Sequence, residues 1–67
     1  MNTHFFFRVV EQADGLWSCR RGREDFCSCD QLDDAIAHTT DFAREHLPSE
    51  VVVHHLDGSV HRVATLD

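Results

Sequence analysis

A chain of 67 residues with 42% hydrophobic residues is long enough for one small domain and too apolar to be disordered. The chain has 12 acidic residues and six basic residues, all of them arginines, and its net charge is −6. This charge disfavours binding to nucleic acid through its phosphates. Its three cysteines cannot all pair within one chain, which argues against a secreted disulfide framework and favours a reducing compartment, the cytoplasm.

The first part of the chain predicts a β-hairpin. Residues 4–12 are rich in β-formers and end at the turn signal Ala13-Asp14-Gly15, after which residues 16–21 form the returning strand. A second turn leads to residues 26–29, which we expect as a short third strand. The apolar run within residues 1–8 ends at an arginine and is too short for a signal peptide or a membrane span, so we expect no membrane association.

A helix is expected over residues 31–46. Asp30 should cap it, because its carboxylate can accept hydrogen bonds from the free backbone N–H groups of the first turn. Apolar residues then recur with the 3.6-residue period of a single buried stripe, and Pro48 marks the end because it disfavours helical backbone at the residue before it. The stripe that should face the sheet contains Leu32, Ala35, Ile36, Thr39 and Ala43.

Two further strands, residues 50–56 and 59–66, flank Asp57-Gly58, the strongest short signal for a β-hairpin. The order of elements is therefore β-β-(β)-α-β-β. We expect one domain over residues 1–67 of the α+β class. In this two-layer arrangement one antiparallel sheet of four or five strands carries a single helix on one face.

The sheet face away from the helix is not expected to be purely polar. Side chains alternate along a strand, so Phe5, Phe7 and Val9 point to one face whereas Phe6 and Val10 point to the other. Whichever of these two faces the helix covers, the other one either exposes some apolar surface, as many proteins do, or is covered by a partner. Both interpretations stay open on the sequence, although a symmetric dimer is the commonest way to cover such a face.

Three segments resemble a family of short bacterial proteins of unknown function, whose members carry W-x-V, then an acidic-Ala-Ile helix start, then V-V-V-H-x-x-D-G. The segments are Trp17-x-Cys19-Arg20, Leu32-Asp33-Asp34-Ala35-Ile36-Ala37-His38 and Val51-Val52-Val53-His54-x-x-Asp57-Gly58. The resemblance rests on their order and spacing and covers almost the whole chain. It implies a small sheet with one helix and supplies no catalytic residues. The chain departs from the family at Cys19, where an aliphatic residue is usual, and in the Cys27/Cys29 pair, so the family lends the cysteines no role.

The cysteines form the first candidate metal site. Zinc takes four thiolate or imidazole ligands, and the C-x-C spacing of Cys27 and Cys29 places both thiols on one face of a strand, with Cys19 and the six histidines as the other possible ligands. This spacing lies far from the usual zinc patterns. We therefore favour three reduced thiols that act as small apolar residues, and expect no bound cofactor.

The second candidate metal site is a histidine pair. A two-residue loop at Asp57-Gly58 would set His54 opposite His61, with Cβ atoms about 5 Å apart. The two imidazoles could then share a metal or repel each other when both are protonated. Two ligands alone bind metal weakly, so two solvated histidines are favoured.

A basic cluster, Arg20, Arg21 and Arg23 near Trp17, carries the alternative of a nucleic-acid-associated domain. Arginines would bind phosphates and the indole would stack on a base. The competing interpretation is a charged turn that pairs with the two acidic residues following it. The net charge favours the turn, so nucleic-acid binding is not expected.

The chain carries no Gly-rich phosphate loop, G-x-S-x-G or H-E-x-x-H motif, and a core of this size leaves little room for a substrate pocket. We therefore expect no enzyme but a non-catalytic protein-interaction module, homodimeric or bound to another protein. Nucleic-acid association and minor Cys/His metal binding are the alternatives. The expected interaction residues are Phe6, Trp17, Arg20, Arg21 and Arg23.

Overall fold

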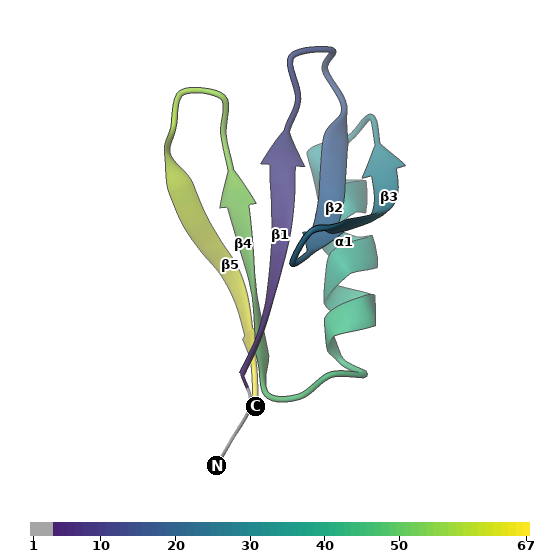
Figure 1. The fold of residues 1–67 in the computed structure, drawn as a ribbon, viewed down its shortest axis with the longest axis vertical. Coiled ribbons are helices and arrows are strands. Elements are labelled where there is room, and N and C mark those ends of the chain that lie inside the picture. The colour runs from purple at the N-terminus through teal and green to yellow at the C-terminus, as the bar shows by residue number, and fades with distance from the viewer. Residues whose placement is uncertain (1–3) are drawn as a thin grey trace.

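The computed structural model describes residues 4–67; residues 1–3, which belong to the N-terminal run considered above, lie outside the described residues. Five strands and one helix follow each other in the expected order (Figure 1). Each predicted strand is found within about two residues of its expected bounds. The elements are β1 (Phe5–Glu11), β2 (Trp17–Arg21), β3 (Glu24–Cys29), α1 (Leu32–Ala43), β4 (Ser49–His54) and β5 (Val60–Leu66).

The strands form one sheet in the order β3-β2-β1-β4-β5, with β1 at its centre. The predicted α+β arrangement of one sheet and one helix is confirmed, but the sheet is mixed and not purely antiparallel, because β1 and β4 run parallel. The reason is the connection through α1. The helix carries the chain back along the sheet, so that β4 starts at the same end as β1 and β3 (Figure 1).

Helix α1 packs on one face of the sheet, mainly over β1 to β4 (Figure 1). The central side chain of this layer is Phe7, which is fully buried and meets the edges of the Phe26 and Phe42 rings at centroid distances of 6.4 and 5.7 Å. Burial of apolar area is the main stabilising term of such a layer. The buried apolar core consists of Phe7, Val9, Cys19, Ala35, Ala43, Val51 and Val53.

The helix differs from its prediction at both ends. Gln31, and not Asp30, occupies the N-cap position, because the first helical hydrogen bond runs from the Ala35 N–H to the Gln31 carbonyl. The Gln31 side chain makes no cap bond. The helix ends at Ala43 and not at residue 46. In the turns that follow, the N–H groups of Glu45 and His46 donate to carbonyls three residues earlier and not four, which is the tighter 3₁₀ pattern. The predicted stripe faces the sheet: Ala35, Thr39 and Ala43 are buried, and the Leu32 and Ile36 side chains are half-buried against the core.

Two β-bulges alter the registers of the outer strands. Between β2 and β3 the pairing shifts so that Cys19 lies opposite Cys27 while Arg20 lies opposite Asp25. Phe26 is therefore the extra residue, and it turns toward α1, where its ring stacks on Phe42 at 4.7 Å. A second shift between β4 and β5 follows Val51.

The β4–β5 hairpin has a longer loop than the two-residue turn considered above. The His55 N–H donates to the Ser59 carbonyl at 2.9 Å, which leaves three residues in the loop, and Gly58 takes the left-handed conformation with φ of 91°. This is a three-residue hairpin loop that ends in a left-handed glycine. As a result His54 lies opposite Val60, and His61 lies opposite Val53.

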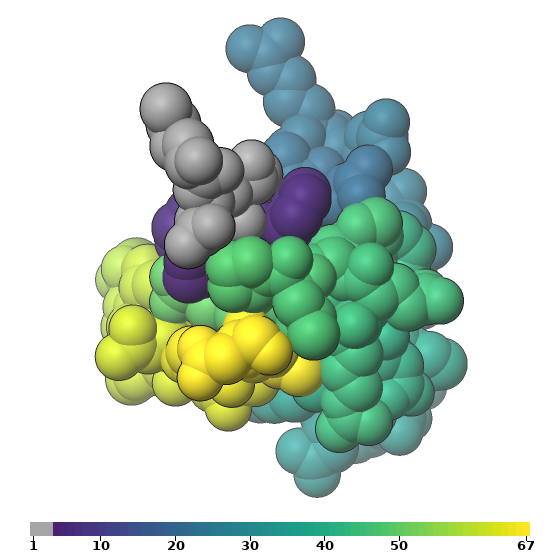
Figure 2. Space-filling view, turned by 90° about the horizontal axis from the view of Figure 1, so that it is seen from below, coloured from purple at the N-terminus to yellow at the C-terminus, as the bar shows by residue number. Residues whose placement is uncertain are grey.

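At the end of the molecule seen in Figure 2, the C-terminal residues, in yellow, pack against the green segment that leads from α1 into β4. The β4 and β5 strands are paired to this end, since Ser49 lies opposite Leu66. Within residues 4–67, no helix has both the length and the apolar composition needed to cross a membrane.

Candidate interaction surface

The sheet face opposite α1 is uncovered by any element among residues 4–67, and we call it the open face (Figure 1). Strand alternation selects its side chains, as predicted for β1: Phe6, Arg8 and Val10 point to it, whereas Phe7 is buried under α1. The contrast within β1 is large. Phe6 is 56% exposed and Phe7 is 0% exposed, although they are neighbours in sequence.

Arginines form a row across the open face. The strand registers place Arg20 of β2 beside Arg8 of β1, Arg8 beside Val52 of β4, and Val52 beside Arg62 of β5. All three guanidinium groups have partners. Arg20 pairs with Asp25 at 2.6 Å, and the other two form the bonds described next.

The remaining two arginines of the row are held at longer distances. Arg62 lies 3.6 Å from Glu50, and Arg8 donates a hydrogen bond of 2.9 Å to the backbone carbonyl of Gly22. Exposed ion pairs of this kind contribute only about 0–1 kcal/mol each, so they orient the arginines more than they stabilise the fold.

Apolar side chains lie on both sides of this row. Val10, His54 and Val60 form the neighbouring row, and the Val60 side chain is 52% exposed. On the other side, the Phe6 ring stacks on His4 with ring centroids 4.8 Å apart. The open face therefore combines exposed apolar area with charges that are already paired.

The open face also differs from the rest of the surface in charge. Arg8, Arg20 and Arg62 stand against Asp25 and Glu50, which leaves one excess positive charge. The rest of the chain holds the other ten acidic residues and the other three arginines. A second copy of this acidic protein would therefore meet the least repulsion at the open face.

The predicted interaction residues do not all reach this surface. Phe6 and Arg20 lie on it, as expected. Trp17 and Arg21 lie on the helix side, because they occupy the odd positions of β2, and Arg23 lies in the β2–β3 turn. The predicted basic cluster is thus divided between two faces and does not form one patch.

Arg21 has a structural role on the helix side. Its guanidinium carbon lies 5.8 Å from the centre of the Phe42 ring, and its Nη1 lies 3.5 Å from His46 Nε2. The residues that the sequence reasoning did not propose are Arg8 and Arg62. Arg8 of β1 and Arg62 of β5 lie on the same face only because β4 joins the two strands, so they could have been identified only once β1 and β4 were known to be neighbours.

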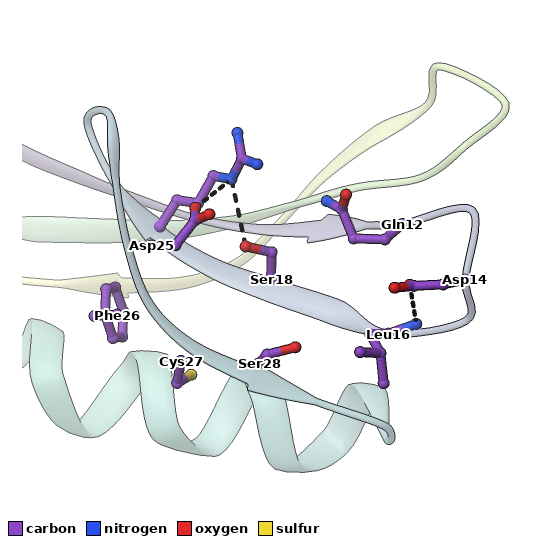
Figure 3. Close-up of a pocket in the computed structure, with 9 residues that line it drawn as sticks. Gln12, Asp14, Leu16, Ser18, Asp25, Phe26, Cys27 and Ser28 are labelled. Atoms are coloured by element: carbon purple, nitrogen blue, oxygen red, sulfur yellow. Dashed lines mark hydrogen bonds and ion pairs between the residues drawn. The ribbon is translucent and has the colours of Figure 1, made fainter.

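A pocket of 470 Å³ opens on the β2–β3 side of the open face (Figure 3). Ser18 and Asp25 line it from the side away from α1. Its carboxylates are engaged: Asp25 pairs with Arg20, and Asp14 accepts a hydrogen bond of 3.0 Å from the Leu16 N–H. Both carboxylates of the pocket therefore already have partners within the chain.

The predicted histidine pair is not formed by His54 and His61, because the longer hairpin loop moves His54 opposite Val60. His61 instead neighbours His55, with ring centroids 5.2 Å apart, and His55 Nδ1 lies 3.7 Å from Glu11 Oε1. The backbone N–H of Leu56 donates to the same carboxylate at 3.0 Å. This contact ties the β4–β5 hairpin to the end of β1.

The same hairpin contains the one described group whose pKa clearly departs from its ordinary value. The hydroxyl of Ser59 donates to the Asp57 carboxylate at 2.7 Å and the Ser59 N–H donates at 2.9 Å. These two hydrogen bonds, the hydroxyl bond above all, hold the pKa of Asp57 below 3.8. Asp57 is thus a turn-forming residue.

The three cysteines come together between the β2–β3 pair and α1. Cys19 and Cys27 face each other across β2 and β3 and form a disulfide, so the expectation of three reduced thiols is wrong for this pair. Cys29 is a free and half-buried thiol. The three sulfur atoms lie within 4.8 Å of one another. The β2–β3 bulge explains this grouping, because without it Cys19 would lie opposite Phe26.

Comparison with protein families gives a single assignment. A family model described as an uncharacterized protein conserved in bacteria (DUF2188) matches residues 7–65, which covers β2, β3, α1 and β4 completely and β1 and β5 except for Phe5, Phe6 and Leu66 at their ends. Comparison with curated proteins and with solved structures gives no match.

Proposed function

The chain belongs to DUF2188, a bacterial family of uncharacterized proteins, and within it we propose that the chain is a non-catalytic protein-interaction module that forms a homodimer through its open face. The proposal places this dimer in the cytoplasm, because three cysteines do not form a secreted disulfide framework, and there the Cys19–Cys27 disulfide would be open to reduction. The observation that carries it is the exposure of Phe6 on a sheet face that α1 does not cover.

The energetic reason is the apolar area that association would remove from water. A phenylalanine side chain can bury about 150–250 Å², so the exposed part of each Phe6 ring amounts to about 100 Å². At about 25 cal/mol per Å², the two rings of a symmetric dimer would contribute about 5 kcal/mol if fully covered. Val60, which is 52% exposed on the same face, would add to this.

The sheet edges support a face-to-face dimer over an edge-to-edge one. Both edge strands, β3 and β5, carry a bulge, and bulged edges pair poorly with a further strand. The charge distribution points the same way, because the acidic helix and loops of two copies repel each other strongly, whereas two open faces carry only one excess positive charge each. A second copy is therefore the occupant that this face suits best.

The test is the molecular mass in solution. Light scattering at tens of micromolar should give a mass near two chains for the wild type. Phe6→Thr introduces a β-branched residue, which suits a strand, and removes the exposed ring, so it should weaken the dimer by at least about tenfold. Leu56→Thr is the matched control, since Leu56 is 61% exposed but lies in the hairpin loop and should not affect the mass. A monomeric wild type, or equal effects of both substitutions, would contradict the proposal.

The arginine row favours nucleic acid as a second candidate partner. Arg8, Arg20 and Arg62 lie in register across one face, beside an exposed aromatic ring. Their existing partners and the net charge of −6 weigh against it. Sub-micromolar binding of single-stranded DNA at physiological salt, lost in Arg8→Gln, would give this candidate precedence over the homodimer.

A further inference from the structure

We infer that Cys19, Cys27 and Cys29, when reduced, form a three-thiolate site for a thiophilic cation such as Zn²⁺, and that the Cys19–Cys27 disulfide is the oxidised form that cannot bind it. The site lies on the helix side of the β2–β3 pair, apart from the open face. It is therefore independent of the proposed homodimer. The carrying observation is that all three sulfur atoms lie within 4.8 Å of one another.

The distances suit a metal. A tetrahedral ion with metal–sulfur bonds of about 2.3 Å holds its thiolates about 3.8 Å apart. All three sulfurs lie within 4.8 Å of one another, and once the Cys19–Cys27 bond is reduced, rotation of the side chains can bring them to this spacing without movement of the strands. Three protein ligands leave one position of a tetrahedral ion for water, and the half-buried Cys27 and Cys29 provide the opening to solvent.

The same geometry disfavours a second disulfide as the purpose of Cys29. Cys27 and Cys29 are two residues apart on one strand, which separates their Cβ atoms by about 6.6 Å, whereas a disulfide needs about 3.5–4.5 Å. Cys29 lies opposite Trp17 and is therefore diagonal to Cys19, which is also too far for a bond. A cation can bridge sulfurs at these positions although a covalent bond cannot.

The opening of the site is a two-electron reduction. In a reducing compartment, one low-molecular-weight thiol attacks a sulfur of the Cys19–Cys27 disulfide and forms a mixed disulfide, and the other cysteine leaves as a thiolate. A second low-molecular-weight thiol then attacks the mixed disulfide. This frees the remaining cysteine and joins the two small thiols in a disulfide of their own. Both electrons thus come from the two small thiols, and Cys19 and Cys27 become thiols. Binding of Zn²⁺ by the three cysteines then releases their protons to water.

The placement of the site ties it to the core. Cys19 is fully buried and its sulfur lies 3.7 Å from the Ala35 carbonyl in the first turns of α1, while Cys27 lies between β3 and α1 (Figure 3). An ion bound here would join β2, β3 and the start of the helix. Because it binds the folded chain only, it should raise the melting temperature of the reduced protein.

The experiment uses the full chain, reduced and oxidised, with Zn²⁺ as the probe and Co²⁺ as its coloured substitute. The reduced wild type should bind one equivalent of Co²⁺ with a thiolate-to-metal absorption band, which Zn²⁺ should abolish by displacement. It should also melt at a higher temperature with Zn²⁺. The oxidised wild type, which retains a single thiol, should do neither.

Two variants make the result specific. Cys29→Ser keeps the buried disulfide pair and the core but leaves two thiolates after reduction, so its affinity for Zn²⁺ should fall by about tenfold or more. His54→Ala is the matched control for the histidines and should bind like the wild type. Absence of binding by the reduced wild type, unchanged affinity in Cys29→Ser, or loss of binding in His54→Ala would each overturn the inference.

Discussion

Phe6 and Phe7 provide the sharpest test of the fold, because substitutions of these two identical neighbours should differ strongly in their effect on stability. Phe7 is fully buried, and its ring contacts Phe26 and Phe42. Removing such a ring costs about 3–5 kcal/mol in Phe7→Ala. A chain of this length has a total stability of about 3–10 kcal/mol, so the variant loses a third or more of it.

Phe7→Leu is the graded version of the same change. It keeps most of the buried volume and loses the aromatic contacts, so we expect a loss of about 1–2 kcal/mol. Phe6→Leu and Phe6→Ala, by contrast, remove area that is largely in water already. Each should change the free energy of unfolding of the monomer by about 0.5 kcal/mol or less.

The assay is urea denaturation followed by the fluorescence of Trp17, the single tryptophan, which lies half-buried on β2. Since a dimer would make the midpoint depend on protein concentration, the comparison belongs at a concentration where dilution no longer shifts the midpoint. Equal losses for the Phe6 and Phe7 variants, or a larger loss for Phe6, would refute the assignment of the two faces of β1.

Three further predictions concern single polar groups. Thr39 is fully buried and its hydroxyl has no hydrogen-bond partner among residues 4–67, so Thr39→Val should raise the free energy of unfolding by about 1 kcal/mol in the same urea assay. The buried Ser49 hydroxyl donates to the Ala43 carbonyl at 3.0 Å, and Ser49→Ala should cost about 1–2 kcal/mol; an unchanged midpoint would show that the bond is not formed. Because the pKa of Asp57 is lowered in the folded chain, its carboxylate should stabilise the hairpin when the pH is above 3.8, the pKa in the unfolded chain. This stabilisation should be lost as the pH falls through the lower, folded pKa. A carboxyl titration by NMR should find that pKa below 3.8 in the wild type and higher in Ser59→Ala, and no difference would contradict the turn.

The elements themselves were predictable from the sequence because each has a local signature. Alternation in β1 placed Phe6 and Phe7 on opposite faces of the sheet without showing which face the helix covers, and the 3.6-residue period identified the stripe on α1. The parallel pairing of β1 with β4 was not predictable in this way. Both strands carry the same local pattern in either direction, and only the path of the chain through α1 decides the direction.

The functional residues were harder to predict because their grouping depends on registers that differ by one residue. One extra loop residue before Gly58 moved His54 away from His61. One extra residue in β3 moved Cys27, and not Phe26, opposite Cys19. Neither the loop length nor the bulge has a signal in the sequence that distinguishes it from the simpler alternative.

The β2–β3 bulge links the two proposed sites and also keeps their chemistry apart. On the open face it aligns Asp25 with Arg20, and on the helix side it aligns Cys27 with Cys19. The sheet lies between these two pairs, so an ion on one side has no direct contact with a partner chain on the other. Each experiment therefore serves as the control of the other: Cys29→Ser should leave the dimer mass unchanged, and Phe6→Thr should leave Zn²⁺ binding unchanged. If either substitution affected both measurements, a shared change in the β2–β3 register would be the explanation, and the two sites would have to be treated as one coupled system.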